Sequence, residues 1–258
     1  GCLDDLIVYR LGEEKYLVVV NAANHDKDVA HMKPNLLPDT TFTDISDETG
    51  LLALQGPESK AIITKILESG ELPEKYYSAS QHVTLVGINC LVSRTGYTGE
   101  FGYEIFCPAD RAADLWDAIL AAGADNGILP CRLEAAMPLY GHEMNETVNP
   151  LETGLDFGVK MNKADFIGKA GIEAHPITRE RIGLKVTGRG IVREEEELYF
   201  GDEKIGHTTS GTFCPYLKGA YAMALVEKGR VSVGDTVEAN VRGRRIAAEV
   251  VPLPFYKR

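Results

Sequence analysis

A glycine-rich stretch at residues 93–104, SRTGYTGEFGYE, holds the first side chains whose types and spacing could do chemistry. Its three glycines recur at every third position between two apolar, β-branched segments, so we expect a loop that joins two strands. On the second strand Glu104 and Phe106 share a face, opposite Tyr103 and Ile105. A carboxylate beside an aromatic ring on a partly covered face needs hydrogen-bond donors. A ligand with adjacent N–H groups would supply them; from spacing alone, a hairpin loop with solvated glutamates is an equal alternative.

Two adjacent carboxylates, Asp4 and Asp5, are the second candidate. We expect them at the start of a strand, where neighbouring side chains point to opposite faces, so that one faces solvent and the other a pocket. A buried carboxylate with few donors has a raised pKa and can act as a general base near neutral pH. For an arbitrary pair of adjacent aspartates, however, two turn acids in water are the more common arrangement.

The segments around these candidates alternate between strands and helices. Residues 5–9 and 16–20 predict a hairpin, and a helix from about residue 24 should end at the prolines 34 and 38. Beyond them, a strand at 51–54 precedes a second helix. The apolar stripe of that helix consists of Ile62, Ile63, Ile66 and Leu67.

A further helix should follow the glycine-rich loop, with Asp110 as its N-cap, Gly123 as its stop and Trp116 in the core. Residues 133–137 also suggest a helix. From Arg181 onward, short alternating strands with glycine turns predict a separate small β-barrel or jelly roll. The segments expected at strand turns there are 207–210 and 242–245.

Composition limits the class of protein. A net charge of −11 disfavours nucleic acid as a partner, because phosphate binding relies on clustered Lys and Arg. No apolar run is long enough for a membrane span, and no signal peptide opens the chain. Five cysteines without a C-x-x-C pair and scattered histidines predict neither a disulfide framework nor a metal site, and they fit a cytoplasmic protein.

Several motifs in order resemble the glycine-cleavage T-protein family, the aminomethyltransferases. They are SRTGYTGEFGYE, DDLIVYRLGEEKYLVVVNAANHDKD, LLALQGPES, RLEAAMPLYGHEMNETVNPLETGL, DFIGK and IGHTTSGTFCPYLKGAYAMALV, and together they span essentially the whole chain. The resemblance implies an α+β, multi-domain cloverleaf with mixed or antiparallel sheets and a C-terminal β-barrel or jelly roll. Residues 1–47 would be the remainder of the second folate-site domain, 48–170 the first domain with the glycine-rich loop, and 171–258 the barrel domain.

The resemblance also implies a reaction. An enzyme of this family transfers the methylene unit of an aminomethyl group, held on the lipoyl arm of the H-protein, to tetrahydrofolate and releases ammonia. Tetrahydrofolate is then the co-substrate, the lipoylated H-protein the partner, and no metal, nucleic acid or membrane is required.

The family's site residues can be placed on matching positions of this sequence. By this resemblance Asp5 is the catalytic carboxylate, and Glu104 accepts paired N–H bonds from the pterin. Tyr97 lines the same cavity, where its ring can cover the pterin face. Asn21 lies at the folate, although asparagines after a strand are more often turn formers or caps. Arg132 is the remaining folate-binding candidate.

Two departures from the family pattern affect these assignments. The family reads P-C-G-L-G-A-R-D shortly before R-L-E-A, whereas Cys131 here runs directly into Arg132. The arginine of that stretch that contacts the folate tail therefore has no counterpart, and Arg132 aligns with the later one. The family also has a substantial N-terminal part before the position of Gly1. Either the sequence omits both parts, or the protein truly lacks them. If the protein truly lacks the internal loop, catalysis is in doubt.

Two alternatives to the aminomethyltransferase remain. Folate-dependent demethylases and iron–sulfur assembly factors share the fold, although the matches RLEAAMPLYGHEM and TSGTFCPYLKGAYAMALV favour T-proteins. A non-catalytic fragment that binds folate or the carrier without turnover is the second alternative.

Overall fold

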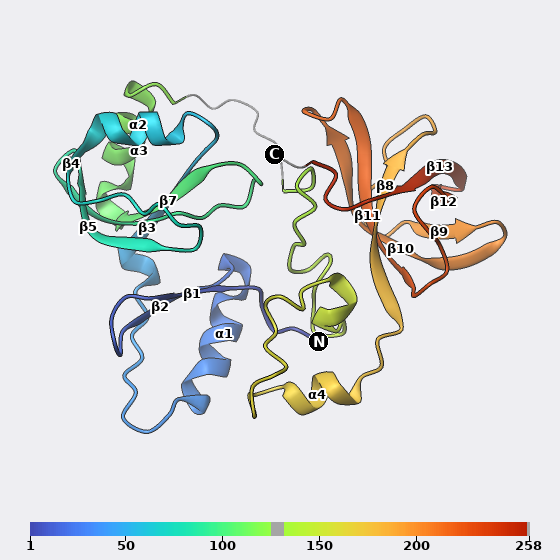
Figure 1. Ribbon diagram of the computed structural model, residues 1–258, viewed down its shortest axis with the longest axis horizontal. Coiled ribbons are helices and arrows are strands. Elements are labelled where there is room, and N and C mark those ends of the chain that lie inside the picture. The colour runs from blue at the N-terminus through green and yellow to red at the C-terminus, as the bar shows by residue number, and fades with distance from the viewer. Residues whose placement is uncertain (125–131, 257–258) are drawn as a thin grey trace. The chain divides into compact units, whose positions relative to one another are not determined.

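The computed structural model describes residues 1–124 and 132–256 (Figure 1). The chain forms two compact units, one of Leu6–Leu129 and the other of Gly1–Asp5 with Pro130–Arg258. Each unit has its own hydrophobic core. The junction of Cys131 with Arg132, where the family resemblance predicts an internal loop, includes a residue outside the described ranges. The three-domain division remains a prediction.

The first unit is built on a five-stranded antiparallel sheet in the order β3-β7-β6-β5-β4. The strands are β3 (Thr49–Gln55), β4 (Leu67–Ser69), β5 (Ala79–Leu85), β6 (Ile88–Ser93) and β7 (Gly102–Pro108). Helices α2 (Ser59–Ile66) and α3 (Ala112–Ala121) cover one face of this sheet (Figure 1). Tyr103 and Ile105 of β7 point into the core between sheet and helices, so the predicted alternation along this strand is confirmed.

The two helices differ in part from their sequence patterns. Ile62, Ile63 and Ile66 are buried as predicted, but Leu67 begins β4. Asp110 lies in a 3-10 turn, Ala109–Arg111, and is not the N-cap of α3. The prediction of Trp116 in the core is wrong, since it is 45% exposed. Successive helical side chains are about 100° apart, so burial of its neighbour Leu115 turns the tryptophan outward.

A hairpin lies on the other face of the sheet. Strands β1 (Ile7–Arg10) and β2 (Tyr16–Val19) pair antiparallel, as predicted. The ring edge of Tyr9 packs on Phe106, with centroids 6.2 Å apart. Because Phe106 alternates with the core-facing residues of β7, this contact places the hairpin opposite α2 and α3 (Figure 1). Helix α1 (His25–Met32) follows the hairpin and ends before the proline at 34, as predicted.

The second unit contains a closed antiparallel barrel in the order β10-β11-β8-β13-β12-β9, which confirms the predicted C-terminal barrel. Its strands are β8 (Arg179–Val186), β9 (Glu197–Phe200), β10 (Glu203–Cys214), β11 (Gly219–Glu227), β12 (Thr236–Val241) and β13 (Arg244–Val251). Leu184, Leu198 and Val237 are fully buried in its core.

Two local predictions in this unit are wrong. Residues 207–210 lie inside β10 rather than in a turn, and a bulge interrupts the pairing between Thr208 and Ser210. The helix predicted at 133–137 is not formed: residues 133–136 lie in turns, because Ala136 adopts a left-handed backbone with φ of 53°. By contrast, Arg242 and Gly243 form the expected turn between β12 and β13.

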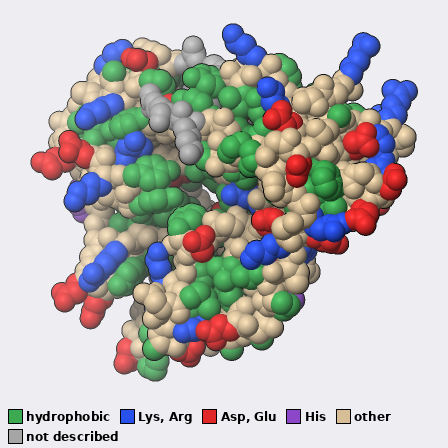
Figure 2. Space-filling view, turned by 45° about the vertical axis from the view of Figure 1, so that its right-hand side comes forward, with side chains coloured by type: hydrophobic (Ala, Val, Ile, Leu, Met, Phe, Trp, Pro, Cys, Tyr) green, Lys and Arg blue, Asp and Glu red, His purple; other side chains and the backbone are tan. Residues whose placement is uncertain are grey.

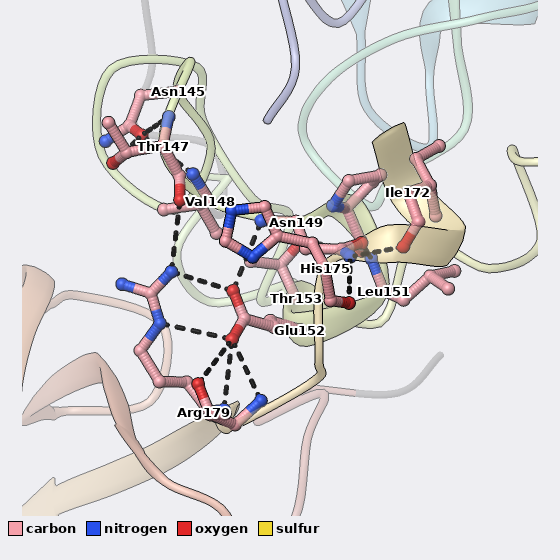
Figure 3. A network of polar contacts seen from close by, with 12 residues as sticks. Asn145, Thr147, Val148, Asn149, Leu151, Glu152, Thr153, Ile172, His175 and Arg179 are labelled. Atoms are coloured by element: carbon pink, nitrogen blue, oxygen red, sulfur yellow. Dashed lines mark hydrogen bonds and ion pairs between the residues drawn. The ribbon is translucent and has the colours of Figure 1, made fainter. Parts of the chain in front are cut away.

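A buried glutamate fastens the segment before the barrel to the first barrel strand (Figure 3). Glu152 lies in a 3-10 turn, Pro150–Thr153, capped by Asn149. Its carboxylate pairs with the Arg179 guanidinium at 2.8 Å and accepts the Arg179 backbone N–H at 3.0 Å. Burial opposes ionisation, but the hydrogen bonds from Arg179 and Asn149 hold the pKa of Glu152 below its usual range. Short helix α4 (Lys169–Ala174) belongs to the same segment.

Candidate functional site

The glycine-rich loop joins β6 to β7, as predicted, and is held from within by Gln55 at the end of β3. The Gln55 amide donates to the carbonyls of Thr95 and Tyr103, each at 3.1 Å. A Cβ at Gly96 or Gly102 would lie 1.9 or 2.2 Å from the Gln55 Oε1 atom. The middle glycine, at position 99, has a left-handed φ of 72°. Two of the three glycines therefore leave space for the Gln55 side chain, and the third allows the left-handed turn of the loop.

Glu104 lies on the sheet face that carries the hairpin. Its direct cross-strand partners are Ala53 and Ser93, and residues opposite one another in a ladder project to the same face. The Thr95 hydroxyl donates to Glu104 Oε2 at 2.5 Å. The side chain is half-buried, so the carboxylate combines partial desolvation with a fixed donor on one oxygen.

Three hydroxyls meet beside this carboxylate. The Tyr9 hydroxyl lies 3.0 Å from Ser93 Oγ and 2.9 Å from Thr95 Oγ1, and the latter two atoms are 2.5 Å apart. All three residues are buried. Burial raises the pKa of Tyr9, the hydroxyl bonds oppose the rise, and Glu104 adds to it, so Tyr9 stays a neutral hydroxyl. Sequence reasoning missed this cluster, although Ser93 and Thr95 belong to the glycine-rich motif.

An arginine between the two small hydroxyl residues braces the loop from its aromatic side. The Arg94 guanidinium lies 3.6 Å from the Phe101 ring centroid and 5.5 Å from that of Tyr76. It also donates to the Gly102 carbonyl at 3.1 Å. Tyr97 is 38% exposed, so part of its ring surface is accessible to a ligand.

Asn21 lies two residues after the end of β2 and is half-buried. It occupies the N-cap position of the 3-10 turn Ala22–Asn24, yet its side chain makes no capping hydrogen bond to that turn. Asn21 therefore does not act as a side-chain cap of this turn, which is the common structural role of asparagine at an N-cap position. Asn21, Tyr97 and Glu104 all belong to the first unit.

Asp5 belongs to the second unit and precedes β1. We predicted that the aspartate pair lies at the start of the strand, but the pairing of β1 with β2 begins only at Ile7, so both aspartates precede the strand. Asp5 is exposed and its neighbour Asp4 half-buried. Although Asp5 is exposed overall, neighbouring atoms partly shield its carboxylate from water, and this partial loss of hydration raises the pKa of Asp5; the charge of Asp4 raises it further. A raised pKa is the property expected of a carboxylate that accepts a proton near neutral pH.

Arg132, also in the second unit, is paired with a buried carboxylate. Its Nη1 atom lies 2.8 Å from Glu143 Oε2, and its Nη2 atom donates to Ser210 Oγ at 2.7 Å. Glu143 is fully buried and also accepts the Ser210 hydroxyl. The same arginine lines a cavity of about 270 Å³ with His142, Arg193 and others. The guanidinium therefore contributes to the structure of this unit as well as to the cavity wall.

Residues 1–124 and 132–256 contain no group of three or more His, Cys, Asp or Glu side chains that could hold a metal ion. Within the same ranges, no helix has the length and apolar character needed to cross a membrane.

Two family models match the chain. The GCVT N-terminal domain matches residues 1–163, and the Glycine cleavage T-protein C-terminal barrel domain matches residues 179–257. An aminomethyltransferase of Bacillus cereus is 41% identical over 270 residues, which cover 100% of this chain and 74% of the relative. An aminomethyltransferase of Bacillus mycoides is 40% identical over the same shares.

A solved structure has the same fold. The crystal structure of glycine cleavage system aminomethyltransferase T from Bartonella henselae matches with a TM-score of 0.84 at 31% identity. The match covers 99% of this chain and 73% of that one.

Proposed function

The chain belongs to the glycine cleavage T-protein family, and from this membership we propose that it is an aminomethyltransferase that transfers a methylene unit to tetrahydrofolate. The donor is an aminomethyl group on the lipoyl arm of a carrier protein, and ammonia is released. The two relatives described above match the whole chain and are named aminomethyltransferases, so a demethylase or an iron–sulfur assembly factor is not favoured.

The single observation that carries the folate assignment is the environment of Glu104. Thr95 occupies one lone-pair direction of Oε2, which leaves Oε1 outside the hydroxyl cluster. A pterin presents an amino group and a ring N–H side by side, and a carboxylate accepts such a pair as a bidentate, charge-assisted contact. Tyr97 would cover the ring face, and Asn21, at the position that the family resemblance places at the folate, would bind through its amide.

Asp5 is our proposed general base. In the reaction the two folate nitrogens form bonds to the methylene carbon. The bonds of that carbon to the amino nitrogen and to the lipoyl sulfur break. The two protons that the nitrogens lose end on ammonia and on the lipoyl thiol, so one carboxylate suffices to carry them. The raised pKa of Asp5 supports this role, because the carboxylate then holds a proton more readily than a solvated aspartate.

We propose that Arg132 binds the folate tail with only part of its N–H donors, because the others are already used within the protein. Its Nη1 atom donates to Glu143 and to the Met137 carbonyl, and one Nη2 hydrogen goes to Ser210. A guanidinium has five N–H donors, so two remain for a carboxylate of the tail. The cavity that it lines also contains Arg193, a second cation for such a group.

The proposed partner is the lipoylated carrier of the glycine cleavage system. Figure 2 shows acidic and basic side chains interspersed over the visible face. With a net charge of −11, attraction to another protein must come from local patches. We propose the cytoplasm as the location, supported by the free thiols of Cys2, Cys90 and Cys107, which suit a reducing compartment.

Single-turnover assays with tetrahydrofolate and aminomethyl-lipoyl carrier test the proposal. We expect ammonia release that depends on both substrates and stops when folate is omitted. Folate binding without ammonia release would support the non-catalytic alternative, and absence of both would reject the proposal. A matched variant, Asp4→Asn, should keep more activity than Asp5→Asn, because only the second aspartate is proposed to accept a proton.

A further inference from the structure

The hydroxyls of Tyr9, Ser93 and Thr95 form a chain that ends on Glu104. Two of its hydroxyl contacts join residues far apart in the sequence, since Tyr9 lies 84 residues before Ser93 and 86 before Thr95. The chain of hydroxyls thus connects the hairpin to the strand that holds Glu104, within one compact unit.

The directions of these hydrogen bonds follow from proton counting. An ionised carboxylate only accepts, so the single proton of Thr95 points to Glu104. The Thr95 oxygen can then only accept further hydrogen bonds. Ser93 Oγ lies 2.5 Å from Thr95 Oγ1, so the Ser93 hydroxyl is the donor in this pair. Tyr9 donates to Ser93 at 3.0 Å. All three protons therefore point toward the carboxylate, and each hydrogen bond polarises the next.

Packing alone would not require these hydroxyls. Tyr9 is 4% exposed and sits edge-on to Phe106, a place that phenylalanine would fill equally well. Thr95 is 1% exposed, and valine has nearly the same shape. Buried hydroxyls are tolerated only where hydrogen bonds compensate their desolvation, and here those hydrogen bonds also fix the direction of each proton. The arrangement therefore indicates a use for the oriented protons.

We propose that Thr95, supported by Ser93 and Tyr9, is a positioning residue that holds the Glu104 carboxylate in one orientation for a reduced pterin. This proposal rests on the folate-binding role of Glu104 given above. With Oε2 held by Thr95, the plane of the carboxylate is fixed before a ligand arrives, so binding loses less side-chain entropy. Tyr9 and Ser93 act through Thr95 and do not touch the ligand.

A double-mutant cycle tests the proposal. The variants are Thr95→Val, Glu104→Gln and their combination, with Thr95→Ser as the conservative rescue and Ser93→Ala as the next member of the chain of hydroxyls. Affinity for 5-formyltetrahydrofolate, an oxygen-stable reduced pterin, is measured by calorimetry, and unfolding is followed in the same samples. We expect Thr95→Val to weaken binding by about tenfold, Ser93→Ala by less, and Thr95→Ser to restore most of the affinity.

The decisive result is the combination. If Thr95 acts through Glu104, Thr95→Val should have little further effect on affinity in the Glu104→Gln background. Equal losses in both backgrounds, or losses that follow the melting temperature alone, would overturn the proposal and leave a structural role.

A second measurement separates this proposal from the folate assignment. In crystals of the ligand-free protein, Glu104 should occupy one rotamer in the wild type and several in Thr95→Val. Unchanged order in the variant would contradict the positioning role whatever the ligand is. If instead the rotamer disperses while Glu104→Gln leaves folate affinity unchanged, the folate assignment fails and the positioning role stands.

Discussion

The side chain of Gln55 occupies the space that a side chain at Gly96 would need, because a Cβ at position 96 would lie 1.9 Å from Gln55 Oε1. The amide of Gln55 in turn donates to two carbonyls, one in the loop and one at the start of β7. A residue of β3 thus shapes the loop that presents Tyr97 and leads into Glu104. The glycines are required as much by this neighbour as by the turn itself.

We predict that Gly96→Ala expels the Gln55 amide and lowers the free energy of unfolding by about 1–3 kcal/mol, because two carbonyls lose their donor. Denaturant unfolding measures this loss. The matched control is Gly171→Ala in α4, where a Cβ meets nothing within 4 Å, and it should be neutral or slightly stabilising. In a Gln55→Ala background the cost of Gly96→Ala should fall, and an unchanged cost would contradict the steric explanation.

Local sequence patterns predicted most of the elements that hold the site. The alternation along β7 placed Glu104 on the face opposite Tyr103, and the hairpin and barrel strands followed from the same period of two. The errors lie where tertiary contacts or backbone strain decide. Trp116 adjoins the buried stripe of α3 without belonging to it, and Ala136 ends a helical pattern with a left-handed backbone.

The hydroxyl cluster could not be predicted from local pattern. Tyr9 meets Ser93 and Thr95 across more than 80 residues of sequence, through packing of a hairpin on a sheet. A serine and a threonine in a loop are ordinary turn residues until a tyrosine and a carboxylate are known to adjoin them. Distances of this kind come only from the folded chain.

Glu104 offers a direct test of pterin recognition. Glu104→Ala removes the proposed acceptor of two charged hydrogen bonds from the pterin and should weaken tetrahydrofolate binding by about 1.5–3 kcal/mol. Calorimetric titration measures the change, and Glu100→Ala in the same loop is the control, since no contact with the pterin is proposed for that residue. Similar losses in both variants would show that charge or loop integrity, rather than the Glu104 carboxylate, governs binding.

The Glu152–Arg179 pair should contribute to stability in a pH-dependent way. Arg179→Met leaves a carboxylate that is 3% exposed without its cation, at a cost of about 2–3 kcal/mol; the arginine is itself a third exposed, which moderates the loss. The matched control is Arg111→Met at the exposed pair with Asp114, where we expect little change.

The pH dependence follows from the sign of the shift. The folded pKa of Glu152 lies below its ordinary 4.5, so the pair's contribution is complete above that value and is lost as pH falls through the folded pKa. The stability difference between wild type and Arg179→Met should therefore be constant near neutrality and shrink in acid. Urea unfolding at a series of pH values measures it, and a difference that grows in acid would contradict the assignment.

Asp5 should control turnover rather than binding. Asp5→Asn keeps the shape of the side chain but removes its basicity, so we expect tetrahydrofolate affinity to change little and the turnover rate to fall by about 100-fold or more. Because loss of hydration and the charge of Asp4 raise the pKa of Asp5 above its ordinary 3.8, the acid limb of the kcat/KM profile should lie above that value. Asp4→Asn removes one of the two causes and should move the limb toward lower pH, with activity retained. A limb that stays in place in Asp4→Asn, or equal loss of folate binding in Asp5→Asn and Glu104→Ala, would show that Asp5 is not the group that accepts the proton.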